Sequence, residues 1–469
     1  MANAEVAAAR VEAAAQPRKW FILVSLGLGS MMGALDINIV NAVMPVMAES
    51  LHTNLAYIEW VSTIFLLCLT GLLLAFGRLG DIRGHKTTLL TGYIGFTLAS
   101  VLCGLAPSIG WLIAFRVLQA IFSTTIMANA PAILTATFPP QQRGRAMGLH
   151  NTIAYVGISA GPPLGGLLAT HFGWRSVFLV NLPVGIVGTL MAVHFIPNDK
   201  PEGKVPPFDL VGACLFFAGL FPLLLALDQG YHWGWTSPLT VGLIVIAVVL
   251  LSIFIKLEHR PHPMLDLSLF RERVFTGSAI SSTLAYLAQN STLFILPFYL
   301  LTARNLTPQG AGLILLAQPL LMTIFSPIAG VLSDRFGPRT PTTLGLTFIT
   351  VGMILLSRSG LAAPLSQITL ALALCGVGFG MFNPPNAARL LSAAPPSRRG
   401  IASGILGATR NGGLVLGTAV TGAIYTTVLS RTGGHGFDQA VSATFLAVAA
   451  ITIVTIFISW KEGATAKAH

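Results

Sequence analysis

Residues Gly77 to Lys86 read GRLGDIRGHK, and residues Gly330 to Arg339 read GVLSDRFGPR, at an offset of 253 residues. A second pair of segments, PPQQRGRAMG from Pro139 and PPSRRGIASG from Pro395, repeats at an offset of 256 residues. Two different motifs that recur at nearly the same spacing indicate an internal duplication. The sequence therefore predicts a chain made of two related halves.

The composition of the chain is that of a membrane protein. Of its 469 residues, 54% are hydrophobic and only 9% are charged, which excludes an ordinary soluble domain. A span needs about 20 apolar residues, and fourteen stretches meet that length. We predict an all-α, polytopic fold with spans at 20–47, 57–79, 88–108, 111–138, 145–170, 175–197, 208–228, 238–257, 274–302, 308–331, 341–359, 363–391, 400–428 and 440–459.

The distribution of lysine and arginine sets the expected orientation. If both termini are cytoplasmic, 21 of the 27 basic residues fall inside, four fall outside, and Arg116 and Arg410 lie within spans. Cytoplasmic loops carry such an excess of positive charge. The net charge of +11 is therefore explained by topology, and no nucleic-acid partner is expected. The first apolar run is long enough to be a retained helix rather than a cleaved signal.

Two six-helix halves account for twelve of the fourteen spans, and the remaining two spans lie between the halves in the sequence. We expect five regions: a cytoplasmic tail (1–19), an N-terminal six-helix bundle (20–197), a linker with two extra transmembrane helices (198–273), a C-terminal six-helix bundle (274–459) and a cytoplasmic tail (460–469).

Duplicated six-helix halves with GxLxDRxGxR-like segments after the second helix of each half resemble the major facilitator superfamily. The fourteen spans and the segment LDINIVNAVMP, Leu35 to Pro45, resemble its drug:proton antiporter branch. The resemblance covers nearly the whole chain. It implies a multi-pass exporter of amphipathic drugs in the bacterial inner membrane, working by alternating access and conferring antibiotic resistance. It also implies no cofactor besides the coupling proton, and a monomer in the lipid bilayer, with or without envelope accessory proteins.

A glycine series in the fifth span matches the antiporter signature of exporters at Gly148, Gly157, Gly161, Pro162, Gly165 and Gly166. Glycines four residues apart share one helix face and permit close backbone approach, and a proline stiffens or kinks that face. The plainer interpretation is close helix packing alone. The resemblance implies that this face seals the two halves together and favours export.

Of the 16 acidic residues, only Asp36 is predicted well inside the membrane. A charged, unpaired carboxylate there costs several kcal/mol, so protonation or a cationic partner is expected. Arg116 and Gln119 in the fourth span form an R-x-x-Q arrangement that the family associates with proton transfer. We predict these three residues as the proton-coupling group, and a structural acid at a break in the first helix is the alternative.

The charged residues of the opening motif are predicted to form a gating loop. Topology alone could explain its basic residues, but not Asp81. We expect Asp81 to face a helix N-terminus or an arginine such as Arg143 or Arg145, and the glycines to let the loop turn tightly. The predicted gating residues are Gly77, Asp81, Arg83, Gly84, Lys86, Asp334 and Arg335.

Polar and aromatic residues in the spans predicted to face a central cavity are candidate substrate contacts: Asn38, Asn41, Met127, Asn129, Tyr286, Gln289, Asn290, Phe294, Phe382, Asn383 and Arg410. A mostly apolar lining with a few polar groups suits amphipathic small molecules, although each residue could equally hold helices together. The predicted spans of the second half contain no acidic residue, so a monocationic, neutral or anionic cargo is expected.

Other chemistry is not indicated. The chain has neither a P-loop nor an HExxH motif, and its four cysteines and ten histidines lack metal-site spacing. We therefore expect no metal site and no enzyme activity. Two alternatives to drug export stay open: a dedicated exporter or importer of one metabolite, and a non-transporting membrane sensor with a carrier fold.

Overall fold

The computed structural model describes residues 2–199, 207–259, 263–360, 363–432 and 436–465. Residues 200–206 and 260–262 of the predicted linker and the end of the predicted C-terminal tail lie outside these ranges. Within the described ranges, fourteen helical segments are long and apolar enough to cross a membrane, as predicted. Lipid offers no hydrogen-bond partners, so a chain that crosses it must satisfy its backbone internally, as these helices do.

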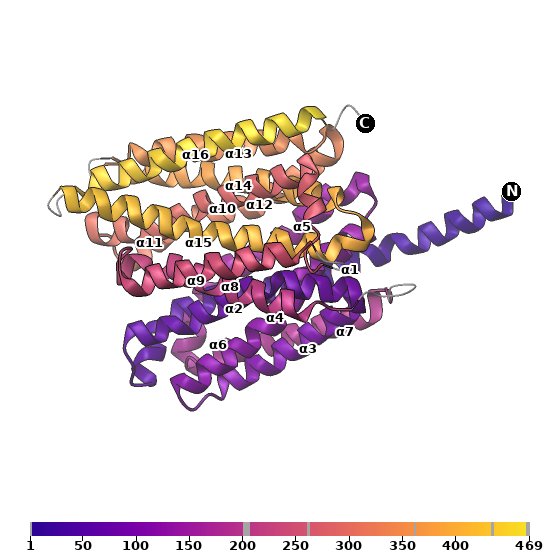
Figure 1. Cartoon of the computed structure of the whole chain (residues 1–469), viewed down its shortest axis with the longest axis horizontal. Helices are drawn as coiled ribbons and strands as arrows, with labels where there is room; N and C mark the ends of the chain where they lie inside the picture. The colour runs from indigo at the N-terminus through magenta and orange to yellow at the C-terminus, as the bar shows by residue number, and fades with distance from the viewer. Residues whose placement is uncertain (1, 200–206, 260–262, 361–362, 433–435, 466–469) are drawn as a thin grey trace.

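The helices of the N-terminal half run side by side (Figure 1). Its sixth span is broken near Val180, which divides six spans into seven helices: α1 (Ala2–Ser50), α2 (Leu55–Arg83), α3 (His85–Gly104), α4 (Ile109–Thr137), α5 (Arg143–Phe172), α6 (Ser176–Leu179) and α7 (Asn181–Phe195).

The central pair and the C-terminal half complete the bundle. A break at Leu316 again divides one span into two helices. The elements are α8 (Leu210–Trp233), α9 (Pro238–Leu257), α10 (Arg273–Phe298), α11 (Pro308–Leu315), α12 (Ala317–Phe336), α13 (Arg339–Ser357), α14 (Leu365–Ala393), α15 (Arg399–Arg431) and α16 (Phe437–Thr465). Each predicted span ends within five residues of the observed one.

The two halves meet along two principal helix pairs. α5 packs against α12, and α2 packs against α15. The extra helix α8 lies against both α2 and α15, and it carries α9 on its other side (Figure 1). The contact with α2 is close, because a Cβ added at Gly71 would lie 2.7 Å from the ring of Phe217 in α8. The central pair therefore covers one of the two seams between the halves.

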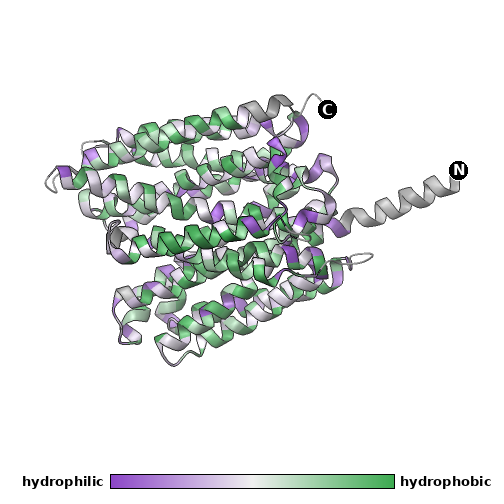
Figure 2. Cartoon of the chain, in the orientation of Figure 1, coloured by the Kyte–Doolittle hydropathy of each residue, from purple (hydrophilic) through white to green (hydrophobic). Residues whose placement is uncertain are grey.

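Hydropathy is arranged in a band across the helices. Apolar residues fill the middle of the bundle and polar residues collect at its two ends (Figure 2). On α9, Val245, Val248 and Val249 are each more than half exposed, as expected for side chains that face lipid. We call the end that carries Arg83, Arg143 and Arg399 the basic end, and the lysine and arginine bias predicts that it faces the cytoplasm.

The structure corrects the prediction that the opening motif is a loop. α2 continues to Arg83 and α3 begins at His85, so Gly84 is the only residue between the two helices. Gly84 has φ +95°, a conformation that residues with a Cβ rarely adopt. The chain therefore reverses at one glycine, while Asp81 lies in the last turn of α2.

Candidate functional site

A buried ion pair lies inside the N-terminal half. The Asp36 side chain in α1 is fully buried, and its Oδ2 accepts a hydrogen bond from Arg116 Nη1 in α4. Asp36 Oδ1 accepts from Gln119 Nε2 and from Asn181 Nδ2, both at 3.0 Å. Arg116 also donates from Nε to Val61 O in α2, at 2.9 Å. Three side-chain donors thus surround the Asp36 carboxylate.

The same cluster extends to a further helix. Ser100 Oγ in α3 accepts from Gln119 Nε2 at 2.6 Å and from Asn181 Nδ2 at 3.2 Å. The guanidinium of Arg116 lies 4.1 Å from the centre of the Phe65 ring in α2, within cation–π range. Five helices of one half therefore meet at a single ion pair. A change in the charge of Asp36 or Arg116 would alter the contacts of all five helices.

At the basic end, Asp81 joins the two halves. Its Oδ1 accepts from Gly400 N at 2.8 Å and its Oδ2 accepts from Ile401 N at 3.1 Å, both in the first turn of α15. The N-terminus of a helix carries a partial positive charge that favours a carboxylate. The backbones cross closely here, because a Cβ added at Gly77 would overlap Gly400 O.

The duplicated motif makes the matching contact. Asp334 Oδ1 in α12 accepts from Gly144 N at 2.8 Å, and its Oδ2 accepts from Arg145 N at 2.9 Å, at the start of α5. A Cβ added at Gly330 would overlap Gly144 O. Of the predicted partners of Asp81, the helix N-terminus is therefore correct, whereas Arg145 belongs to the contact made by Asp334 and Arg143 donates to Ser392 Oγ. We call these two contacts the Asp81 lock and the Asp334 lock.

The remaining gating residues lie beside the locks. Asp199 accepts from His85 N at 2.7 Å and from Lys86 N at 3.0 Å, so it caps α3 in the same two-amide manner. Lys86 Nζ donates to Val193 O at 3.0 Å. Arg83 and Arg335 are exposed at the basic end, where they contribute to its positive charge.

The glycine face of α5 does not join the halves, contrary to expectation. Added Cβ atoms at Gly157, Gly161 and Gly165 would meet Met31, Asn38 and Ile39, which all belong to α1 of the same half. The face therefore fixes α1 to α5. The earlier interpretation was wrong because spacing reveals that a face is close-packed but not which helix lies against it.

Other members of the glycine series have different surroundings. A Cβ added at Gly148 would meet Ser326 O of α12, so this glycine does lie between the halves, and Ser326 Oγ donates to Gly148 O at 2.9 Å. Gly166 has nothing within 4 Å of such a Cβ. Pro162 is exposed, and α5 continues through it without a break.

The candidate substrate residues differ in how far they are buried, and two of them lie close together, with Arg410 Cζ 5.7 Å from the centre of the Tyr286 ring. Asn129 and Phe382 are fully buried, so neither presents a surface to a substrate in this state. Asn129 Oδ1 lies 2.7 Å from His85 Nδ1 beside the Asp81 lock. Each of the following is partly or fully exposed: Asn38, Asn41, Met127, Tyr286, Gln289, Asn290, Phe294 and Arg410.

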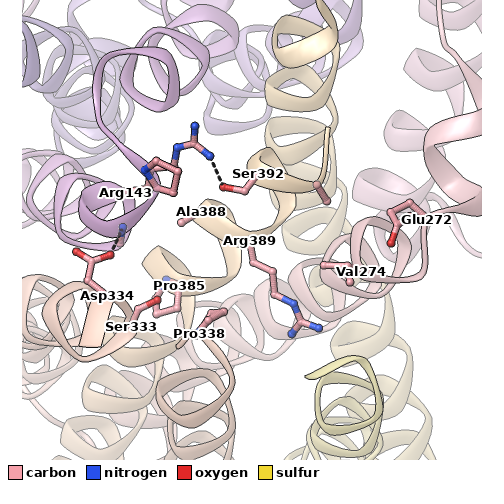
Figure 3. A pocket seen from close by; sticks show the side chains of 13 residues that line it. Arg143, Glu272, Val274, Ser333, Asp334, Pro338, Pro385, Ala388, Arg389 and Ser392 are labelled. Carbon is pink, nitrogen blue, oxygen red and sulfur yellow. Dashed lines mark hydrogen bonds between the residues drawn. The ribbon is translucent and has the colours of Figure 1, made fainter. Parts of the chain in front are cut away.

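A pocket of about 410 Å³ lies between the halves at the basic end (Figure 3). Asp334 and Arg143 are among the residues that line it, and Arg143 Nη1 donates a hydrogen bond to Ser392 Oγ at 3.0 Å. A second pocket of about 230 Å³ includes Phe294, Phe298 and Tyr425. The first pocket therefore belongs to the gate, and the second is lined mainly by aromatic and aliphatic groups.

Comparison with known proteins fits the duplicated architecture. The family model described as Major Facilitator Superfamily matches residues 26–265 and 278–467. The chain belongs to the Major Facilitator Superfamily. Its fold is similar to that of the superfamily's proton:xylose symporter XylE, with a TM-score of 0.67 over 95% of this chain and 96% of that one, at 14% identity.

Two relatives in the superfamily match nearly the whole chain. The riboflavin transporter RibZ of Clostridioides difficile is 31% identical over 92% of this chain and 93% of its own length. The tetracenomycin C resistance and export protein of Streptomyces glaucescens is also 31% identical, over 89% of this chain and 77% of its own. The protein is thus a membrane transporter of a superfamily branch that includes drug-resistance proteins.

Sequence reasoning missed some residues of this transporter's polar clusters. Asn181 and Ser100 both contact the Asp36 ion pair, but neither was singled out. Asn181 was visible as the polar residue in FLVNLPVG, Phe178 to Gly185. Tyr155 belongs to no recognisable sequence motif. Its hydroxyl nevertheless accepts a hydrogen bond from Asn383 Nδ2 of the other half, at 2.9 Å.

Proposed function

We propose that this superfamily transporter exports amphipathic, drug-sized molecules from the cytoplasm in exchange for protons. The observation that carries the proposal is the fully buried Asp36–Arg116 pair, which places one titratable carboxylate at the meeting point of five helices. The relative named as a tetracenomycin C resistance and export protein supports the direction and the class of cargo.

A path of contacts leads from Asp36 to the gate. Asp36 lies on α1, and residues that follow it, Asn38 and Ile39, fit against Gly161 of α5. The first turn of α5 is held by the Asp334 lock. Protonating Asp36 removes the negative charge that pairs with Arg116 and so loosens the packing of α1. Because α1 packs against α5, the first turn of α5 at the Asp334 lock then shifts.

Cargo loading and protonation then favour opposite states. Both locks are formed at the basic end in this structure, and in the proposed cycle this is the state that restricts access from the cytoplasm. Cytoplasmic cargo binds when the locks open, and a proton arriving from the outside at Asp36 drives the return. Each charge moved across the membrane supplies about 2.3 kcal/mol per 100 mV, enough to accumulate cargo many-fold against its gradient.

The test is transport by the purified protein in liposomes with an imposed pH gradient. Riboflavin and tetracenomycin C are the first cargoes, followed by a cationic dye. We expect accumulation of at least one of them only while the gradient is present, with abolition by a protonophore. Cargo accumulation that does not depend on the pH gradient, or that occurs without any movement of protons, contradicts proton exchange.

A dedicated riboflavin transporter is the second candidate, because RibZ and this chain match over more than nine-tenths of both sequences. Competition distinguishes the two functions. A multidrug exporter moves several unrelated cargoes that inhibit one another, whereas a dedicated carrier moves riboflavin and is inhibited only by flavins.

A further inference from the structure

Arg410 is a positive charge placed near the middle of the membrane. It follows Arg399, the first residue of α15, by eleven residues, which at 1.5 Å per residue is a depth of about 17 Å. The hydrocarbon core is about 30 Å thick. A guanidinium at this depth is costly, and it persists where it pairs with a carboxylate or takes part in function.

Arg410 differs from Arg116 because its charge is not balanced by an acid. The acidic residues of the C-terminal half that follow Glu272 are Asp334, Asp438 and Glu462, which all lie at helix ends or beyond. Within the described part of the chain, no ion pair includes Arg410, and its buried Nε has no hydrogen-bond partner. The site therefore carries a net positive charge.

Aromatic and polar groups surround this guanidinium. Its Cζ lies 5.7 Å from the centre of the Tyr286 ring in α10, and it interacts electrostatically with Tyr155 and His150 of α5. Tyr155 accepts a hydrogen bond from Asn383 of α14, so its own phenol proton is left to donate elsewhere. We call these five residues the Arg410 cluster. Since α5 belongs to one half and the other helices to the second, the cluster changes shape when the halves move.

We propose that the Arg410 cluster binds an acidic group on a planar aromatic cargo. The inference rests on the proposed transport function and specifies the substrate class for it. A guanidinium binds carboxylate and enolate oxygens through two parallel hydrogen bonds, and it prefers them strongly where water is excluded. The ring of Tyr286, which is only partly buried, supplies a flat apolar surface for the aromatic part.

The same charge selects against cations. A cationic cargo at this position would meet an uncompensated arginine, which is a repulsive contact that costs affinity without any steric clash. Neutral cargo avoids the repulsion but leaves the guanidinium unpaired. The cluster therefore ranks acidic cargo first, neutral cargo second and cationic cargo last.

Three probes with one ring system test this order: naphthalene-2-carboxylate, naphthalene-2-carboxamide and 2-naphthylmethylammonium. Equilibrium binding is measured on the purified full chain in detergent, without a gradient. We expect the wild type to bind the carboxylate at least tenfold more tightly than the amide, and the ammonium most weakly. Arg410→Gln should reduce carboxylate binding to the level of the amide and leave amide binding within twofold.

Two variants separate this effect from misfolding. Arg410→Lys keeps the charge and should retain part of the carboxylate preference. Arg431→Gln removes an exposed arginine at the far end of the same helix and should behave as wild type. The proposal is overturned if Arg410→Gln keeps the full carboxylate preference, if the wild type binds the ammonium at least as tightly, or if it binds no carboxylate measurably.

The binding result is independent of proton coupling. If liposome transport does not depend on the pH gradient while the preference for the carboxylate probe still depends on Arg410, the exchange mechanism is contradicted and the binding site is supported. If transport follows the gradient but the three probes bind without regard to charge, the site fails and the mechanism stands.

Discussion

Asp81 and Gly400 are joined by a 2.8 Å hydrogen bond although 319 residues separate them in the chain. The duplicated motif repeats the arrangement between Asp334 and Gly144, also at 2.8 Å. In both contacts a carboxylate at the end of one helix holds the first turn of a helix in the other half. The two halves are therefore fastened twice at the basic end, once along each seam.

Removing the charge from either lock should open the basic end. We expect Asp81→Asn and Asp334→Asn each to destabilise the closed state by about 1 kcal/mol, the usual strength of a carboxylate at a helix N-terminus. The measurement is labelling of Ser326→Cys, a fully buried position between α12 and α5, in a background without native cysteines. Labelling should rise several-fold, and the transport cycle should slow with little change in cargo affinity.

Arg271→Gln is the control for the locks, because Arg271 is an exposed charged residue at the same end of the molecule. It should leave labelling unchanged. Unaltered labelling in both aspartate variants, together with a loss of cargo affinity, would assign the motif to binding rather than gating.

The close backbone crossings should tolerate no side chain. A Cβ at Gly77 would overlap Gly400 O, so Gly77→Ala forces α2 and α15 apart. We expect the transport rate to fall at least tenfold and Ser326→Cys labelling to rise. Gly166→Ala is the matched control, since nothing lies within 4 Å of its added Cβ, and it should stay within twofold of wild type. Normal transport by Gly77→Ala would show that the crossing is not essential.

The sequence predicted the fold well because membrane spans are long, apolar and individually recognisable. The repeat at Gly77 and Gly330 also predicted the two halves. The glycine face at Gly157 and Gly161 was identified as close-packed, but its partner was assigned to the wrong half. Packing partners depend on how helices are arranged in three dimensions, which periodicity along one helix does not contain.

The candidate ion pair was predictable in part. Asp36 and Arg116 were conspicuous as charges in apolar spans, and the structure brings them into contact. Asn181 was not conspicuous, because asparagines also serve in ordinary helix packing. The helical state of Asp81 was missed because a cluster of charges and glycines is typical of a turn.

A pH-dependent stability is expected from Glu258, in the segment after α9. Its side chain is only 4% exposed, and Oε2 accepts from Leu265 N at 2.9 Å. Burial raises the pKa of Glu258 from 4.5 to about 7. The folded protein therefore holds this proton more tightly than the unfolded chain, so stability should fall as pH rises from about 4.5 through 7.

Thermal unfolding of the purified protein between pH 5 and pH 8 measures this effect. Glu258→Gln cannot ionise, so its Tm should fall by several degrees less than that of the wild type over this range. The exposed Glu49→Gln should follow the wild type. Parallel pH profiles for wild type and Glu258→Gln would exclude Glu258 as the source.

Asn181 should contribute to proton-coupled transport although it belongs to no recognised sequence motif. Asn181→Ala removes one donor to Asp36 and one to Ser100, and a lost hydrogen bond to a buried charge costs about 1.5–3 kcal/mol. We expect gradient-driven transport to slow about tenfold with KM nearly unchanged. Thr189→Ala is the control on α7, because among the described residues its hydroxyl bonds only to Gly185 O of its own helix. Equal rates for the two variants would remove Asn181 from the coupling group.

The most direct test of proton coupling at Asp36 compares two modes of transport in Asp36→Asn liposomes. Counterflow exchanges labelled for unlabelled cargo and needs no proton, so it should persist at half the wild-type rate or more, which also shows that the variant is folded. Accumulation driven by a pH gradient should fall to the level seen without a gradient. If Asp36→Asn accumulates cargo at the wild-type, gradient-dependent rate, Asp36 is not the coupling residue.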